Sequence, residues 1–129
     1  MKTFEKLIYD GERVLGDMCI LQYPEINRWF LQYDVDPEYR NQGIMSRELP
    51  LFLLECKDKG FNQICAMVKK DNLPSIKLLE KNNFVEFKTI NDTITYIIDL
   101  RVNKEESLEM VKMFKELRND RHIPTTRAD

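Results

Sequence analysis

The fold of this chain is decided by the stretch VDPEYRNQGIM, residues 35–45. Residues 28–35, rich in aromatic and β-branched side chains, are typical of a strand that ends at Val35. A polar loop follows. From Gly43 to Lys59 apolar residues recur at the spacing of an amphipathic helix, with Pro50 inside the pattern. The stretch therefore predicts a strand, a short loop and a helix that begins at a glycine.

A helix start of this kind can bind an anion. The first backbone N–H groups of a helix have no intrahelical partner, and they lie at the positive end of the helix dipole. Gly43 would let the backbone approach a phosphate or pyrophosphate closely, and Arg40 would add a positive charge. Many strand-to-helix turns bind nothing, so these residues alone leave a phosphate site and an empty turn as alternatives.

The segments on either side predict the remaining elements. Asp10-Gly11 separates two strand-like runs, and Gly16 in the second run indicates a bulge or a close backbone approach. Asn103 is expected to cap a final helix over about residues 104–118. The other expected elements are a hairpin over residues 4–9 and 13–22, a strand over 61–68, a helix over 75–81 and a hairpin over 84–89 and 93–100. The order β-β-β-α-β-α-β-β-α predicts an α/β (α+β) fold with a mostly antiparallel sheet.

Composition excludes several classes of protein. A chain of 129 residues with 43% hydrophobic and 33% charged residues fits one folded domain. The formal charge of −2, from 20 Lys+Arg against 22 Asp+Glu, gives no argument for a nucleic-acid partner. No run approaches the ~20 apolar residues of a membrane helix. Three cysteines without a CxxC pair and a single histidine, His122, favour a reduced, cytoplasmic protein without a metal site.

Two motifs resemble those of the GNAT family of N-acetyltransferases. Residues 40–45 resemble the family's acyl-CoA pyrophosphate loop, Gln/Arg-x-x-Gly-x-Gly/Ala, and residues 35–39 resemble its lead-in. Residues 72–84 resemble a second motif, in which an Asn begins a short helix that ends in a Gly-Phe pair. The resemblance covers about residues 6–100. It implies a central β-α-β-α-β unit without the family's usual N-terminal strand and helices, with residues 1–120 as one acyl-CoA-binding domain and residues 121–129 as a loose tail.

The resemblance also implies an activity, the transfer of an acetyl group from acetyl-CoA to an amine by direct attack on the thioester. The pantetheine arm would lie between the splayed strands 28–35 and 61–68. The N–H of Val35 would polarise the thioester carbonyl, and Asn72 would bond the arm or hold the strands. The cofactor-binding residues expected on this basis are Val35, Arg40, Asn41, Gln42, Gly43, Ile44, Met45, Ser46, Asn72 and Ser75. No catalytic residue is assigned, and Asp34, Glu25 and Tyr96 are left as candidate bases.

Three departures from the family pattern keep other functions open. Met45 replaces a small residue of the loop, Asn83 replaces the glycine before Phe84, and Leu79 stands where many members have a tyrosine that protonates the CoA thiolate. Leu79 and the missing acceptor wall favour an alternative, an acyl-CoA-binding module with little or no transferase activity. An interaction protein without CoA would require Met45 to block the loop. The amine acceptor is not identified, and incomplete cover of the sheet predicts a homodimer.

Overall fold

The computed structural model describes the backbone of residues 2–126 and the side chains of residues 3–117. Within this range the strands form one sheet in the order β1-β2-β3-β4-β6-β5. The strands are β1 (Lys2–Asp10), β2 (Arg13–Tyr23), β3 (Arg28–Val35), β4 (Gln63–Lys69), β5 (Val85–Ile90) and β6 (Thr93–Asp99). The helices are α1 (Ile44–Asp58), α2 (Leu73–Lys81) and α3 (Lys104–Thr126), and a 3₁₀ turn covers Pro37–Tyr39. The predicted mixed, mostly antiparallel fold is confirmed.

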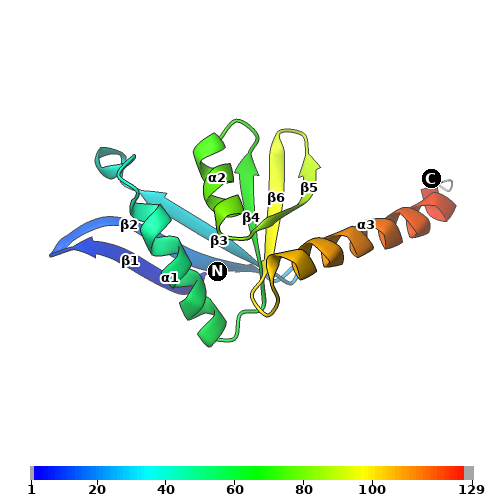
Figure 1. Cartoon of the computed structure of the whole chain (residues 1–129), viewed down its shortest axis with the longest axis horizontal. Coiled ribbons are helices and arrows are strands. Elements are labelled where there is room, and N and C mark those ends of the chain that lie inside the picture. Colours follow the sequence, from blue (N-terminus) through cyan, green and yellow to red (C-terminus); the bar gives the residue numbers. More distant parts are fainter. Residues whose placement is uncertain (1, 127–129) are drawn as a thin grey trace.

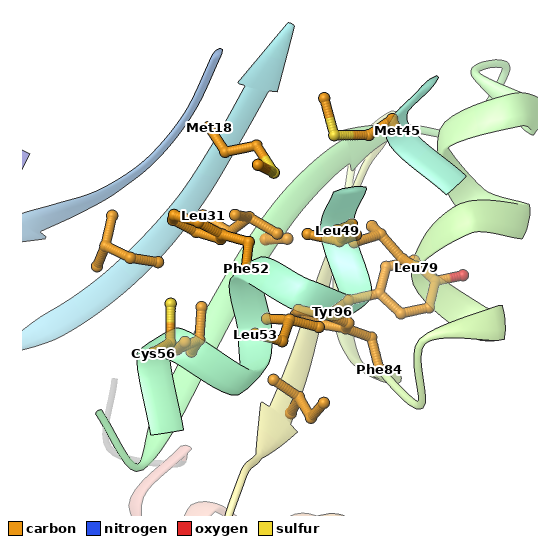
Figure 2. Packing of buried hydrophobic residues seen from close by; sticks show 14 of the residues in the cluster. Met18, Leu31, Met45, Leu49, Phe52, Leu53, Cys56, Leu79, Phe84 and Tyr96 are labelled. Carbon is orange, nitrogen blue, oxygen red and sulfur yellow. The ribbon is translucent and has the colours of Figure 1, made fainter. Parts of the chain in front are cut away.

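The helices lie on both faces of the sheet (Figure 1). Successive side chains of a strand point to opposite faces, so β4 shows which helix covers which face. Ile64 and Ala66 belong to the main hydrophobic cluster with α1 and α2, whereas Cys65 packs in a second cluster with Val111 of α3. Figure 2 shows the main cluster, in which Phe52 of α1 and Phe84 are almost fully buried.

The centre of the sheet opens between β3 and β4. These neighbours are the parallel pair in the described sheet, and their register consists of a single residue pair, Phe30 with Cys65. The β2–β3 and β4–β6 pairs, by contrast, remain in register along the strands. β3 and β4 therefore diverge beyond Phe30 and Cys65, toward the ends at which α1 and α2 begin.

Gly16 fixes the position of the β3 end. It pairs with Val35 across the β2–β3 ladder. A Cβ atom at Gly16 would overlap the carbonyl oxygen of Asp34 and lie 2.9 Å from Cα of Val35. The expected close backbone approach is confirmed, because only glycine lets β2 lie so near the strand that borders the opening.

The last helix is longer than its sequence pattern predicted. Apolar periodicity is lost after Leu117, which predicted an end near residue 118 and a loose tail from residue 121. Instead α3 continues to Thr126, and residues 127–129 lie outside the described part of the chain. Residues 118–123 contain neither glycine nor proline. The apolar periodicity therefore ends at a point where the sequence has no residue that would terminate the helix. No helix within residues 2–126 is long and apolar enough to cross a membrane.

Candidate functional site

A cleft of about 810 Å³ occupies the opening between β3 and β4. Its walls come from the end of β3, the start of α1, the end of β4 and the first turns of α2. A volume of this size is in the range of small-molecule and cofactor sites. Of the ten residues that the sequence predicted for cofactor binding, all except Gln42 line this cleft. The two motifs are separated in the sequence and meet at one site.

Backbone N–H groups of β3 point into this cleft. The N–H of Asp36 donates to the carbonyl of Leu15 at 2.8 Å, so it faces β2. Because successive N–H groups of a strand point to opposite sides, those of Val35 and Tyr33 face β4. Over this part of β3 no residue of β4 is in register with them. The N–H of Val35 is therefore placed to donate to a group bound between the strands.

The start of α1 is open toward the same cleft. Gly43 is the N-cap and makes no side-chain cap hydrogen bond, and the first helical bond runs from the N–H of Arg47 to its carbonyl. The N–H groups of Ile44, Met45 and Ser46 precede that bond, so they lack an intrahelical acceptor. The first turn contains no acidic side chain. An anion at this end would meet three N–H donors and the positive end of the dipole.

The other described helices differ at this point. The side chain of Asn72 accepts a hydrogen bond from the N–H of Ser75 at 3.3 Å and caps α2. Asn103 accepts from the N–H of Glu106 at 2.9 Å and caps α3, as the sequence predicted. Among the α-helices of residues 2–126, α1 is thus the one whose first turn has no side-chain cap.

The loop before α1 contains two residues in the left-handed region, Asn41 at φ +64° and Gly43 at φ +72°. A Cβ atom at Gly43 would meet no protein atom within 4 Å. The conformation, and not crowding by the protein, therefore favours glycine here. The space in front of Gly43 is open, as the approach of a pyrophosphate would need.

Arg40 holds the strand end. Its Nε donates to the carbonyl of Val35 at 2.8 Å, and its Nη2 donates to the Asp34 carboxylate at 3.1 Å. Both side chains are more than half exposed, and an exposed ion pair is worth only ~0–1 kcal/mol. The guanidinium thus contacts the end of β3. Because its ion pair with Asp34 is weak, it could turn to a bound phosphate at a small cost in free energy.

Two of the three departures from the family pattern concern buried side chains. Met45 is 8% exposed and packs in the main hydrophobic cluster, where Figure 2 shows it. Its side chain therefore does not block the loop. Leu79 is 1% exposed in the same cluster and also borders the cleft, without a hydroxyl. Asn83 has φ +70°, a left-handed conformation that asparagine, like glycine, tolerates better than most residues.

Tyr33 and Ser75 connect the two sides of the cleft. The Tyr33 hydroxyl on β3 and the Ser75 hydroxyl on α2 form a hydrogen bond, and both residues line the cleft. Burial raises the pKa of Tyr33, and the bond to Ser75 partly offsets this effect. The residue pattern of β3 does not indicate this contact. A contact between residues 42 positions apart leaves no local sequence signal.

The three candidate bases lie in different parts of the structure. Asp34 lines the cleft but pairs with Arg40. Glu25 lies in the turn between β2 and β3, at the end of β3 away from the cleft. Tyr96 does not line the cleft; its hydroxyl donates to Glu80 at 3.0 Å, and burial and Glu80 raise its pKa to about 12. Of the three, the structure brings only Asp34 to the cleft.

The cysteines take no part in this site. Cys19, Cys56 and Cys65 are buried thiols that form no disulfide. Burial, the largest cause, raises the pKa of the Cys56 thiol to about 12 and also raises that of Cys65, which makes them poor nucleophiles at neutral pH. Within the described residues, no group of three or more His, Cys, Asp or Glu side chains could hold a metal ion.

Comparison with known proteins identifies the family. Residues 3–84 match the model of the Acetyltransferase (GNAT) family. An N-acetyltransferase from Staphylococcus aureus Mu50 is 27% identical with a TM-score of 0.62, over 73% of this chain and 66% of that chain. An acetyltransferase from Salmonella typhimurium that modifies the N-terminal serine of ribosomal protein L7/L12 is 20% identical with a TM-score of 0.58, over 74% and 62%.

A third solved structure contains the cofactor. It is a ribosomal L7/L12 α-N-protein acetyltransferase in complex with coenzyme A, 19% identical with a TM-score of 0.60, over 74% of this chain and 60% of that chain. This chain thus spans 60–66% of the length of these three relatives. The search of curated proteins gives no match. Because the family model matches more than half of the sequence, the chain belongs to the GNAT family of acetyltransferases.

Proposed function

We propose that this protein is an N-acetyltransferase that transfers the acetyl group of acetyl-CoA directly to an amine. One observation carries the proposal: the uncapped start of α1 opens into the cleft between the diverging strands β3 and β4. The N–H groups of residues 42–46 would hold the pyrophosphate, with Arg40 nearby. The pantetheine arm would lie between β3 and β4, near Asn72 and Ser75.

In the reaction, the amine nitrogen attacks the thioester carbonyl carbon, and the carbonyl oxygen becomes an oxyanion. The N–H of Val35 faces this space and would donate to the oxyanion. The C–S bond then breaks, the thiolate takes a proton, and the new amide nitrogen loses one. A thiol of pKa near 8.5 can leave as a thiolate without an acid, so the absence of a hydroxyl at Leu79 slows this step and does not prevent it.

The cleft favours an amine that is partly neutral at pH 7. Asp34, the candidate base that reaches it, projects from the face of β3 opposite to that of Tyr33 and Val35. A lysine amine with pKa ≈ 10.4 is neutral in only about four molecules per ten thousand, whereas an α-amine with pKa ≈ 7.7–8.0 is neutral in about one in ten. We therefore propose a terminal α-amine as the acceptor class, acetylated in the cytoplasm, where reduced cysteines persist.

The main alternative is an acyl-CoA-binding module of GNAT fold with little or no transfer. Leu79 favours it, because its buried side chain supplies no proton to the thiolate. Both functions predict cofactor binding, so binding alone does not separate them. An interaction protein without CoA loses its support, because Met45 packs into the core instead of filling the loop.

Two measurements test the proposal. First, acetyl-CoA should raise the melting temperature of the protein, with dephospho-CoA and free pantetheine as graded controls for the nucleotide contacts. Second, a panel of amines, including a short peptide with a free α-amine and its N-acetylated copy, should show thiol release only with free amines. A thermal shift without thiol release would support the binding module. No thermal shift would contradict both functions.

A further inference from the structure

We propose that the Tyr33–Ser75 hydrogen bond is a strap across the cofactor cleft, which covers the pantetheine arm on the helix side and holds it between β3 and β4. The inference rests on the proposed function. It adds Tyr33, for which the family motifs predict no role, as a positioning residue. Three observations support it: the face on which Tyr33 lies, the bond that it forms, and its difference from a second tyrosine that also contacts α2.

The first observation is the direction of the Tyr33 side chain. Tyr33 packs against the main hydrophobic cluster, as do Leu31 and Val35, its neighbours two positions away on β3. All three side chains therefore project from the sheet face that α1 and α2 cover. The opening between β3 and β4 begins next to this strand, so the ring of Tyr33 rises beside the opening on the helix side.

The second observation is the hydrogen bond of the Tyr33 hydroxyl. This hydroxyl bonds the side chain of Ser75 in the first turns of α2. The backbone N–H of Ser75 in turn donates to the N-cap side chain of Asn72. Because α2 directly follows β4 in the chain, the bond joins the β3 side of the opening to the β4 side. The backbone N–H of Tyr33 meanwhile faces β4 within the sheet. An arm bound between the strands would lie below the ring and beside this N–H.

The third observation is a matched contact elsewhere. Tyr96 on β6 also bonds α2 through its hydroxyl, at Glu80, but it does not line the cleft. Both tyrosines tie α2 to the sheet, so both contribute to the stability of this helix. Only the Tyr33 contact crosses the opening. The strap therefore predicts an effect on cofactor affinity that separates Tyr33 from Tyr96.

Titration calorimetry with acetyl-CoA tests the strap in the full chain. Tyr33→Phe removes only the hydroxyl. The start of α2 is then no longer held across the opening in the free protein and must be ordered when the arm binds, so the Kd should rise by up to about 5-fold, the limit set by the net worth of one hydrogen bond. Ser75→Ala should have the same effect, and the double variant should be no weaker than either single variant, because one shared interaction is lost. Tyr96→Phe should lower the melting temperature and leave the Kd unchanged.

Kinetics with an amine that releases thiol give a second readout. The strap predicts a higher KM for acetyl-CoA in Tyr33→Phe with kcat retained at saturation. An unchanged Kd in Tyr33→Phe, or an equal change in Tyr96→Phe, would overturn the strap. A fall in kcat at unchanged Kd would also overturn it and assign the hydroxyl to proton transfer. Failure of the wild-type protein to bind acetyl-CoA would instead overturn the proposed function.

Discussion

Gly43 offers a test of pyrophosphate binding at a single residue. Gly43→Val places a β-branched side chain at φ +72°, in front of the open N–H groups of α1. The protein has no atom within 4 Å of the new Cβ, so the variant should fold with a lowered melting temperature. The added side chain should occupy the ligand's space. We therefore expect the stabilisation by acetyl-CoA to be lost, as measured by thermal shift.

A second glycine provides the control for backbone strain. Gly60, at the other end of α1, has φ +92° and likewise no neighbour within 4 Å of a built Cβ. Gly60→Val should lower the melting temperature for the same conformational reason and keep the full shift with acetyl-CoA. Loss of the shift in both variants, or its retention in Gly43→Val, would contradict the assignment of the α1 start.

Leu79→Tyr tests the missing proton donor. The buried position must accommodate a larger side chain, so we expect a loss of ~1–3 kcal/mol in stability. The added hydroxyl stands where many family members carry an acid, and kcat should rise ~10-fold, a small part of what general acid catalysis can provide. Activity should then fall at alkaline pH, as the phenol ionises and loses the proton that it donates.

Leu79→Phe separates bulk from chemistry, because it adds the ring without the hydroxyl. The kcat of the two variants should be compared over a pH series at saturating acetyl-CoA. If the Tyr and Phe variants have equal rates and bind acetyl-CoA normally, then either another hydroxyl already serves as the acid or the protein is not a transferase.

Sequence predicted residues well where the backbone conformation dictates the residue type. Gly43, which the sequence placed at the start of α1, has a positive φ that few residue types tolerate. The contacts of Arg40 and Tyr33 were not predictable in this way. An arginine at position 40 can bind either a phosphate or a backbone carbonyl, and the sequence does not show that it binds the carbonyl of Val35. Tyr33 and Ser75 come together only in the tertiary fold.

At the scale of elements, α2 depends on its N-cap residue, Asn72. Its side-chain oxygen caps the helix, and the same amide is expected to contact the pantetheine arm. Asn72→Ala should cost ~1 kcal/mol of stability, the usual value of an N-cap. It should also weaken acetyl-CoA binding by ~1–2 kcal/mol, as a partly buried partner loses its hydrogen bond. Titration calorimetry measures the second effect.

Two variants distinguish the cap from the ligand contact. Asn103→Ala removes an equivalent cap from α3, which packs on the other face of the sheet, and should lower stability without changing the affinity for acetyl-CoA. Asn72→Ser keeps a capping oxygen but loses the amide, so stability should recover while binding stays weak. Wild-type affinity in Asn72→Ala would mean that Asn72 is only a helix cap.

Element order followed from periodicity, but the opening between β3 and β4 did not. Both strands have ordinary strand patterns, and the divergence appears only in their single paired position. The resemblance to the family, not the residue pattern, placed the cofactor between them. The predicted end of α3 was wrong for a related reason. Apolar periodicity indicates where a helix packs on the rest of the protein, and a helix can continue beyond that contact.

At the scale of the whole molecule, α3 leaves the body after its first turns. Ser107 and Val111 are buried against the sheet. Met113, Phe114 and Leu117 are 58%, 47% and 51% exposed, and Figure 1 shows the helix running outward. These side chains form a contiguous face at helical spacing. Because α3 packs on the sheet face opposite α1 and α2, contacts made by this exposed face would leave the cleft accessible.

We therefore expect a homodimer that buries this face of α3, since an exposed apolar face usually marks an interface and two-fold dimers are the commonest assembly. Light scattering at micromolar concentration should give twice the chain mass. Phe114→Glu should shift the protein to monomer and retain the thermal shift with acetyl-CoA. Leu108→Glu is the control, because Leu108 is 48% exposed but lies opposite Leu117 and about 120° around the helix from Phe114. A monomer mass for the wild-type protein, or equal effects of the two variants, would refute this interface.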